Sequence, residues 1–434
     1  MTLPRRLSRA AISVAALLVW GGAASAQTAP FGTLPGGIAY TIETDPSQPA
    51  AAVSLWYRAP ASGFDAVPLP GLAKVAATTV AASTPVTGMS LGQVVRRAGG
   101  RLSIAAYPDS VAITALVAPE QVAAVVRAMT ADYFAPVTDG AGLRIAQREV
   151  ADDMLYRSFV PADAIEDALA AALFTAGPFH DGQGATVEQI RAVTLPRVTA
   201  FAERAFRPSN AVLVLTGNVP STALTAVAAR NGASPGTEPP VPPAPRPQPT
   251  TIAKTANVGG IGLGWNGPPI ADEASATALD LVADRLFSAS GSVTKALAKR
   301  KATVTGRFVT FHDPGMFLVT ISGDEAAAVR PAVEAAIAEA AHPLAPAPFG
   351  AAKAAFVYHL LDDMQTPDQL ADTFGWYAVE GNPSYAPARG GARSRYFSLA
   401  AALTPEAVAA IAHRYLGTAP AVVTLATPAP AKPS

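Results

Sequence analysis

Apolar residues along the chain alternate, or recur every three to four positions, in short runs that form two similar series. Alternation predicts β-strands, and recurrence every three to four residues predicts amphipathic helices. The first series predicts strands at residues 37–43, 52–58, 101–106, 110–117 and 211–217, and helices at 72–82, 93–99, 119–133, 142–158, 161–173, 187–193 and 195–206. Residues 178–184 have the composition of a turn-rich loop. Strands followed by helices and a closing strand indicate an α+β sandwich.

The second series repeats this plan. It predicts strands at residues 258–265, 303–310, 316–321 and 421–426, and helices at 272–287, 292–299, 325–340, 348–363, 368–380 and 405–416. In the helix at 272–287, Ala278, Leu279, Val282 and Leu286 have the spacing of one apolar face. The two series therefore predict two similar halves.

A proline-rich stretch separates the two series. Residues 231–250 contain eight prolines, which favours an extended and stiff linker. We therefore predict a first domain at residues 27–230, a linker at 231–250, a second domain at 251–428 and a short tail at 429–434. Two α/β-sandwich halves joined by a linker favour a clamshell, with function in the cleft between the halves.

The first 26 residues are typical of a secretory signal peptide. Arg5 and Arg6 give a positive start, residues 10–20 form a short apolar core, and Ala24-Ser25-Ala26 is a small-residue cleavage site. An uncleaved membrane anchor is the alternative, but the apolar run is short for a span. We expect export to the periplasm of a Gram-negative cell, or otherwise to the outside. No membrane association is expected after cleavage.

The composition excludes several classes of chemistry. The chain has no cysteine, which rules out disulfides, thiolate zinc sites and cysteine nucleophiles. The formal net charge is zero, so nothing indicates a phosphate-binding surface, and no nucleic-acid partner is expected. Half of the residues are apolar, which is enough for a sizeable core.

Several short motifs occur in one order along the chain, and that order resembles the insulinase/pitrilysin-like (M16) metallopeptidase family. In the first half they are Leu34-Pro35-Gly36-Gly37-Ile38, Trp56-Tyr57-Arg58, Gly71-Leu72-Ala73, Gly99-Gly100 and Tyr107-Pro108-Asp109. In the second half they are residues 264–269, 297–302 and 312–317. The resemblance covers nearly the whole chain after the signal, and it implies a clamshell of two homologous halves (LuxS/MPP-like).

The resemblance also identifies a site that has lost its chemistry. In the family, an inverted His-x-x-Glu-His motif follows Gly-Leu-Ala, and a downstream glutamate is the third zinc ligand. Carried over to this chain, the two histidines fall on Lys74 and Thr78, the glutamate of the motif on Ala77, and the third ligand at about Met154. The resemblance therefore implies a protein without catalytic residues and without zinc, which would be expected only in an active partner.

A second family pattern, with an arginine and a tyrosine that hold the substrate, is also altered. The comparable run is residues 297–305, where Ala298 takes the place of the arginine and no tyrosine follows. Arg300 and Lys301 are possible contacts for a peptide carboxylate. The alternative is a solvated basic end of a helix.

Other candidate chemistry is weak. No two of the five histidines are three to five residues apart, so no histidine pair shares one helical face. His359 with Asp362 and Asp363 is the nearest approach to a cluster, and we expect it on a solvated helix face. His180 and His312 are expected in turns. Ser292 and Lys295 match Ser-x-x-Lys, but no Lys-Thr-Gly strand follows.

These observations support three hypotheses. The first is an exported, inactive M16-like subunit that pairs as a heterodimer with an active M16 subunit and helps to hold peptides or unfolded protein segments. The second is an active zinc metallopeptidase whose ligands are not recognised. The third is a stand-alone periplasmic binding or scaffold protein.

Overall fold

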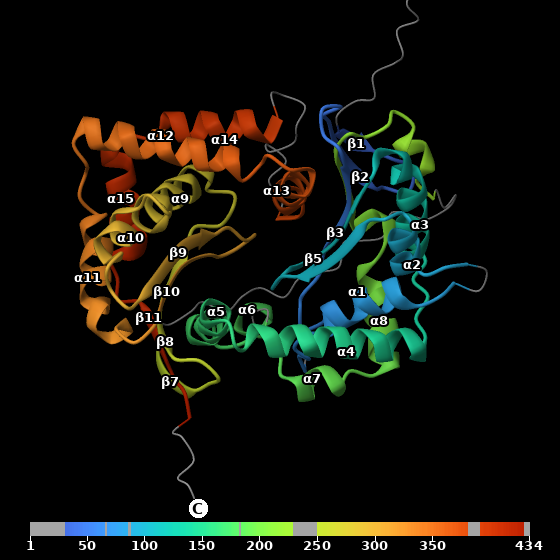
Figure 1. Ribbon diagram of the computed structural model, residues 1–434, viewed down its shortest axis with the longest axis horizontal. Coiled ribbons are helices and arrows are strands. Elements are labelled where there is room, and N and C mark those ends of the chain that lie inside the picture. Colours follow the sequence, from blue (N-terminus) through green and yellow to red (C-terminus); the bar gives the residue numbers. More distant parts are fainter. Residues whose placement is uncertain are drawn as a thin grey trace, which may run out of the picture.

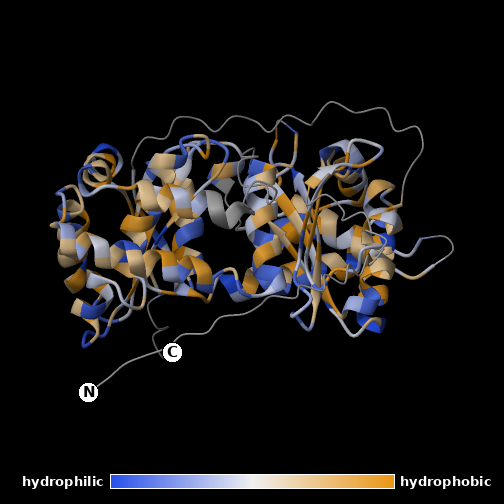
Figure 2. Ribbon diagram, turned by 90° about the horizontal axis from the view of Figure 1, so that it is seen from above, coloured by the Kyte–Doolittle hydropathy of each residue, from blue (hydrophilic) through white to orange (hydrophobic). Residues whose placement is uncertain are grey.

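The structure is a computed structural model that describes residues 31–65, 67–85, 88–181, 184–228, 250–380 and 391–428. Figure 1 shows two halves, each with a β-sheet and its own helices. Seen from above in Figure 2, the halves lie side by side, and apolar residues run through both. The predicted signal peptide, nearly all of the predicted linker and the tail lie outside the described residues.

The first half contains one six-stranded sheet and its helices. Its strands are β1 (Phe31–Thr33), β2 (Ala39–Thr44), β3 (Ala51–Arg58), β4 (Arg101–Ala106), β5 (Ser110–Val117) and β6 (Ala211–Gly217). Its helices are α1 (Leu72–Ala82), α2 (Leu91–Arg97), α3 (Val122–Phe134), α4 (Gly140–Arg157), α5 (Pro161–Leu173), α6 (Pro178–Asp181), α7 (Val187–Arg191) and α8 (Leu195–Ala205). Short 3-10 turns occur at Pro119–Gln121, Pro208–Asn210 and Ala223–Ala226.

The second half contains a five-stranded sheet. Its strands are β7 (Thr251–Thr255), β8 (Gly260–Gly267), β9 (Thr303–Val309), β10 (Gly315–Ser322) and β11 (Ala421–Ala426). Its helices are α9 (Glu273–Phe287), α10 (Ser292–Leu297), α11 (Ala326–Glu339), α12 (Pro346–Asp362), α13 (Pro367–Glu380), α14 (Gly391–Ala402) and α15 (Pro405–Leu416).

The two sheets have the same topology. The strand order is β1-β2-β6-β3-β5-β4 in the first and β7-β11-β8-β10-β9 in the second. In each sheet the closing strand pairs in parallel with the opening strand, β6 with β2 and β11 with β7, and the other neighbours are antiparallel. Apart from β1, the strands therefore correspond one to one, and the predicted fold class of two homologous α+β halves is confirmed.

The halves exchange helices. Helix α5 belongs to the first half but packs on β8, β10 and β11, and α13 belongs to the second half but packs on β3, β5 and β6. Both helices lie between the sheets in Figure 1. In consequence Ala52, Trp56 and Val214 of the first sheet share one apolar core with Leu370 and Phe374 of α13.

Glycines allow these helices to approach closely. On β8, Gly260, Gly262 and Gly264 alternate with larger residues and face α5. A Cβ at Gly262 would lie 2.5 Å from Ile165 Cγ2 and 2.8 Å from Leu169 Cγ. The alternation of glycine in this strand is therefore a packing requirement of the exchanged helix.

Four elements differ from the sequence predictions. The edge strands β1 and β7 were not predicted, because β1 has three residues and β7 is almost entirely exposed. Helix α14 was not predicted either, since its sequence lacks a regular apolar face. Part of the predicted loop at 178–184 is the short helix α6. None of the helices in the described part of the chain has both the length and the apolar composition needed to cross a membrane.

Candidate functional site

The four positions that the resemblance assigns to the zinc ligands and the general base, Lys74, Ala77, Thr78 and Met154, lie together where α1 packs on α4. Helix α1 begins after Gly71, which has a positive φ of 81°. A Cβ on Gly71 would lie 2.3 Å from Ile190 Cδ1, so a larger residue would not fit at this turn. The turn positions Lys74 toward α4, where its Nζ forms an ion pair with Asp153 Oδ2.

The other three positions are apolar or buried. Ala77 is fully buried, and Thr78 and Met154 are 7% and 6% exposed. The hydroxyl of the buried Tyr133 donates a hydrogen bond of 2.7 Å to the Ala77 carbonyl. The structure thus brings the four predicted positions to one contact between two helices, next to the acidic residue Asp153.

This contact does not fit a zinc ion. Zinc binds imidazole, thiolate and carboxylate groups, whereas the positions supply an ammonium, a methyl, a hydroxyl and a thioether. The ammonium of Lys74 already neutralises Asp153 and would repel a metal cation. Across the described residues, no group of three or more histidine, aspartate or glutamate side chains is arranged to hold a metal ion.

A free strand edge passes beside the contact. β4 is the last strand of the six-stranded sheet, and it pairs with β5 on one side only. A cavity of 270 Å³ and another of 530 Å³ are both lined by Lys74, Ile104 and Asp153. The degenerate site therefore adjoins an edge on which an extended segment could add as a further strand.

Arg300 and Lys301, the possible peptide contacts, lie at the turn between α10 and β9. Glu325 accepts a hydrogen bond from Arg300 Nε and another, 3.3 Å long, from the Lys301 backbone N–H. The Arg300 side chain is 44% exposed. Both residues are therefore held by a neighbour in their own half. Among the arginines that do line cavities are Arg307 on β9 and Arg157 on α4.

Asp362 and Asp363 are exposed, as expected for a solvated helix face, whereas His359 is half-buried and contacts a second helix. Its Nδ1 lies 2.6 Å from Asp284 Oδ1 of α9, and both residues line a cavity together with Asp363. Asp362 does not line it. The partner of His359 lies 75 residues earlier in the sequence, so local spacing gave no signal for it.

A buried carboxyl pair joins the halves. Asp109, in the turn between β4 and β5, is 3% exposed, and Glu380, at the end of α13, is 1% exposed. Burial raises the pKa of both groups, and the Asp109 charge raises the pKa of Glu380 further. Glu380 Oε2 accepts a 2.7 Å hydrogen bond from the His312 N–H. His312 lies in the predicted turn, and its backbone N–H also holds the Glu380 carboxyl group that faces Asp109 of the first half.

One family model matches part of this chain. Residues 192–344 match the family model described as the peptidase M16 inactive domain. A comparison with curated proteins gives no significant match.

Solved structures share the fold over nearly the whole chain. A protease from Helicobacter pylori is 15% identical, with a TM-score of 0.78 over 92% of this chain and 99% of that one. A chain of complex III2 from Candida albicans is 13% identical, with a TM-score of 0.76 over 91% of this chain and 94% of that one. A peptidase M16 inactive domain from Pseudomonas fluorescens is 15% identical, with a TM-score of 0.75 over 94% of this chain and 100% of that one.

The paired sandwiches have the two-domain clamshell architecture of these M16-like structures. Over nearly its whole length the chain has the fold of these M16-like structures, and its residues 192–344 match the M16 inactive-domain family. The resemblance predicted from the sequence is confirmed.

Proposed function

We propose that this protein is an exported, catalytically inactive M16 subunit that completes the peptide-binding chamber of an active zinc peptidase. The observation that carries the proposal is the ion pair between Lys74 and Asp153 at the contact where the family places its zinc. An ammonium there supplies neither a metal site nor a general base for water. The match to an inactive-domain family supports the same conclusion.

The role left to such a subunit is to hold peptide. The exposed edge of β4 offers backbone N–H and C=O groups to an extended chain, and the cavities beside it give room for side chains. Strand addition depends on backbone groups and tolerates many sequences, which suits a chamber that accepts varied substrates. Arg300 and Lys301 remain possible contacts for a peptide carboxylate.

Assembly with an active subunit is supported by analogy. One chain of similar fold is part of complex III2 from Candida albicans, a multi-subunit assembly. A heterodimer would place the zinc in the partner and the second wall of the chamber in this chain. The signal-like residues 1–26 support export before assembly.

The proposal is tested by co-expressing residues 27–434 with an M16 subunit from the same source that keeps an intact His-x-x-Glu-His motif. We expect co-purification in a one-to-one complex, with faster peptide cleavage than the active subunit shows alone. A chain that stays monomeric and leaves the cleavage rate unchanged would instead support the stand-alone binding or scaffold hypothesis.

A variant that disrupts the β4 edge tests peptide binding at this edge directly. Ala106→Pro removes an N–H on the open side of β4, because Ala106 and Val111 form a non-hydrogen-bonded pair of the β4–β5 ladder, and it should lower the cleavage rate of the complex without preventing its assembly. Ala106→Ser, which keeps this N–H, is the matched control and should have no effect. Equal rates for the two variants would exclude peptide binding at this edge.

A further inference from the structure

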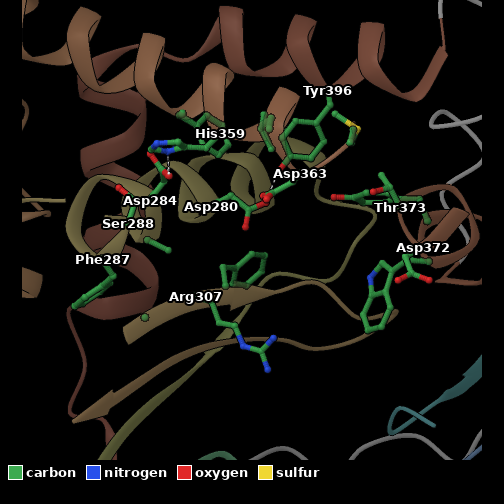
Figure 3. Close-up of a pocket in the computed structure, with 18 of the residues that line it drawn as sticks. Asp280, Asp284, Phe287, Ser288, Arg307, His359, Asp363, Asp372, Thr373 and Tyr396 are labelled. Carbon is green, nitrogen blue, oxygen red and sulfur yellow. Dashed lines mark hydrogen bonds and ion pairs between the residues drawn. The ribbon is translucent and has the colours of Figure 1, made fainter. Parts of the chain in front are cut away.

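A well-formed cavity among the described residues lies away from the degenerate zinc site. It has a volume of 540 Å³, within the range of small-molecule sites. Most of its wall comes from α9, β9, α12 and α13 of the second half, and Trp56 and Tyr107 close it from the first half. Figure 3 shows its polar side chains arranged around a common space.

Acidic groups dominate the polar part of this wall. Four aspartates line the cavity, Asp280, Asp284, Asp363 and Asp372. His359 is hydrogen-bonded to Asp284 alone. Within the described part of the chain, no ion pair neutralises the other three carboxyl groups, so the polar side of the cavity is acidic.

The one arginine on the wall does not offset this charge. Arg307 forms a bidentate contact with Glu166 of α5, with its Nε 3.0 Å from Glu166 Oε1. In Figure 3 its guanidinium extends away from Asp280 and Asp284. Arg307 is therefore neutralised by a residue that does not line this cavity.

Aromatic rings form the rest of the wall. Trp56 and Tyr107 stack at 5.9 Å with an interplanar angle of 3°, and Trp376 meets Tyr107 edge-on at 4.6 Å. Phe308 and Tyr396 also line the space. Aromatic faces attract cations, and their apolar area favours a ligand with an apolar body.

Two of these aspartates have raised pKa values, as expected for buried carboxyl groups without a cationic partner. Burial raises the pKa of Asp280 to about 7, although the Tyr396 hydroxyl donates a hydrogen bond to it. Burial and the neighbouring Asp368 raise the pKa of Asp372 to about 6. A cation in the cavity would favour the charged form of both groups.

We propose that this cavity is a binding site for an organic cation, whose ammonium or guanidinium group lies between Asp280 and Asp372 and whose apolar body covers the rings of Tyr107 and Trp376. The ligand is either a free amine or the basic side chain of a peptide. Because the cavity wall comes from both halves, such a ligand would also bridge them and stabilise their closed arrangement. The site is independent of the proposed loss of catalysis.

The test uses the chain from residue 27 and two matched pairs of probes, with binding measured by calorimetry and by tryptophan fluorescence. The first pair is 2-phenylethylamine and its neutral analogue 2-phenylethanol. The second is the capped tripeptide Gly-Arg-Gly and its citrulline analogue. We expect saturable binding of at least one cationic probe and much weaker binding of its neutral analogue, and the pair that binds identifies the source.

Variants assign the binding to the cavity. Asp280→Asn and Asp372→Asn should each weaken binding about tenfold or more, since a hydrogen bond to a charged group contributes about 1.5–3 kcal/mol. Asp362→Asn is the matched control, because this exposed aspartate does not line the cavity, and it should leave the affinity unchanged. Circular dichroism confirms that each variant is folded.

Three outcomes would overturn the proposal. They are equal binding of charged and neutral probes, equal weakening by Asp362→Asn, and no saturable binding of either cation in the low-millimolar range. If Asp280→Asn fails to fold, Asp372→Asn decides alone, because its carboxylate is exposed to the cavity and accepts no hydrogen bond described for the chain.

Discussion

The packing of α13 on the first sheet predicts a definite cost for one added methyl group. A Cβ at Gly375 would lie 1.9 Å from Trp56 Nε1 and 2.3 Å from Trp56 Cδ1. Trp56 is fully buried and stacks on Tyr107, so its ring has no free space into which it could move. Gly375→Ala therefore forces α13 away from the sheet of the other half.

The size of the effect follows from two opposing contributions. Ordinary contacts begin near 3.4 Å, so the helix or the ring must shift by about 1.5 Å. Overpacking of this kind costs roughly 1–3 kcal/mol, whereas replacing glycine by alanine inside a helix gains about 1 kcal/mol. We expect Gly375→Ala to lower the free energy of unfolding by up to about 2 kcal/mol.

Gly350→Ala in α12 is the matched control. No atom lies within 4 Å of the Cβ that it would add. The helix propensity gain is then unopposed, and we expect stabilisation by about 0.5–1 kcal/mol. Urea unfolding of both variants and the parent chain, followed by circular dichroism and tryptophan fluorescence, measures the two changes.

The two variants should move the unfolding midpoint in opposite directions. If Gly375→Ala stabilises the protein as much as Gly350→Ala does, then α13 does not contact Trp56. The described packing of α13 on the first sheet, and the cavity that depends on this packing, would then be incorrect.

Three further predictions concern charged groups. Since burial raises the pKa of Glu380 above its unfolded value, its stabilising contribution is complete below about pH 4 and is lost as the pH rises through the folded pKa. Glu380→Gln should therefore flatten the decline in melting temperature between pH 5 and pH 8, and an unchanged slope would exclude this group as its source. Lys74→Met breaks the ion pair with Asp153, but the side chains are 20% and 43% exposed, so the loss in unfolding free energy should stay below about 1 kcal/mol. The triple variant Lys74→His, Thr78→His, Met154→Glu should gain zinc in calorimetry and metal analysis, and a folded variant without zinc would show that the positions are misassigned.

Most of the fold could be predicted because its signals are local. Helix α1 spans residues 72–82 and α5 spans 161–173, as predicted, because a proline or glycine precedes each apolar pattern. The strand β7 escaped prediction for a physical reason. An edge strand buries little surface, so it carries no alternating pattern to detect.

The spatial arrangement could be predicted less well. Periodicity shows that Ile165 and Leu169 belong on one apolar face, but it does not show that this face covers the sheet of the other half. The contacts of His359 with Asp284 and of His312 with Glu380 join residues more than 65 positions apart. The acidic and aromatic cavity arises from such contacts and left no motif in the sequence.

The positions of the degenerate site could be predicted from the sequence, but the ion pair between Lys74 and Asp153 could not. The resemblance placed Lys74 and Met154 at the former ligand positions, and the structure brings them to the same α1–α4 contact. The ion pair of Lys74 with Asp153 lies one residue from the predicted ligand and required the structure to be found.

The most direct test of the central claim is the zinc content of the purified chain from residue 27, measured beside peptide hydrolysis with and without a chelator. Protein that contains no stoichiometric zinc and cleaves no peptide would agree with an inactive subunit in which Lys74 replaces the metal site. Near-stoichiometric zinc together with chelator-sensitive cleavage would contradict it, and would mean that an active metallopeptidase site lies elsewhere in the chain.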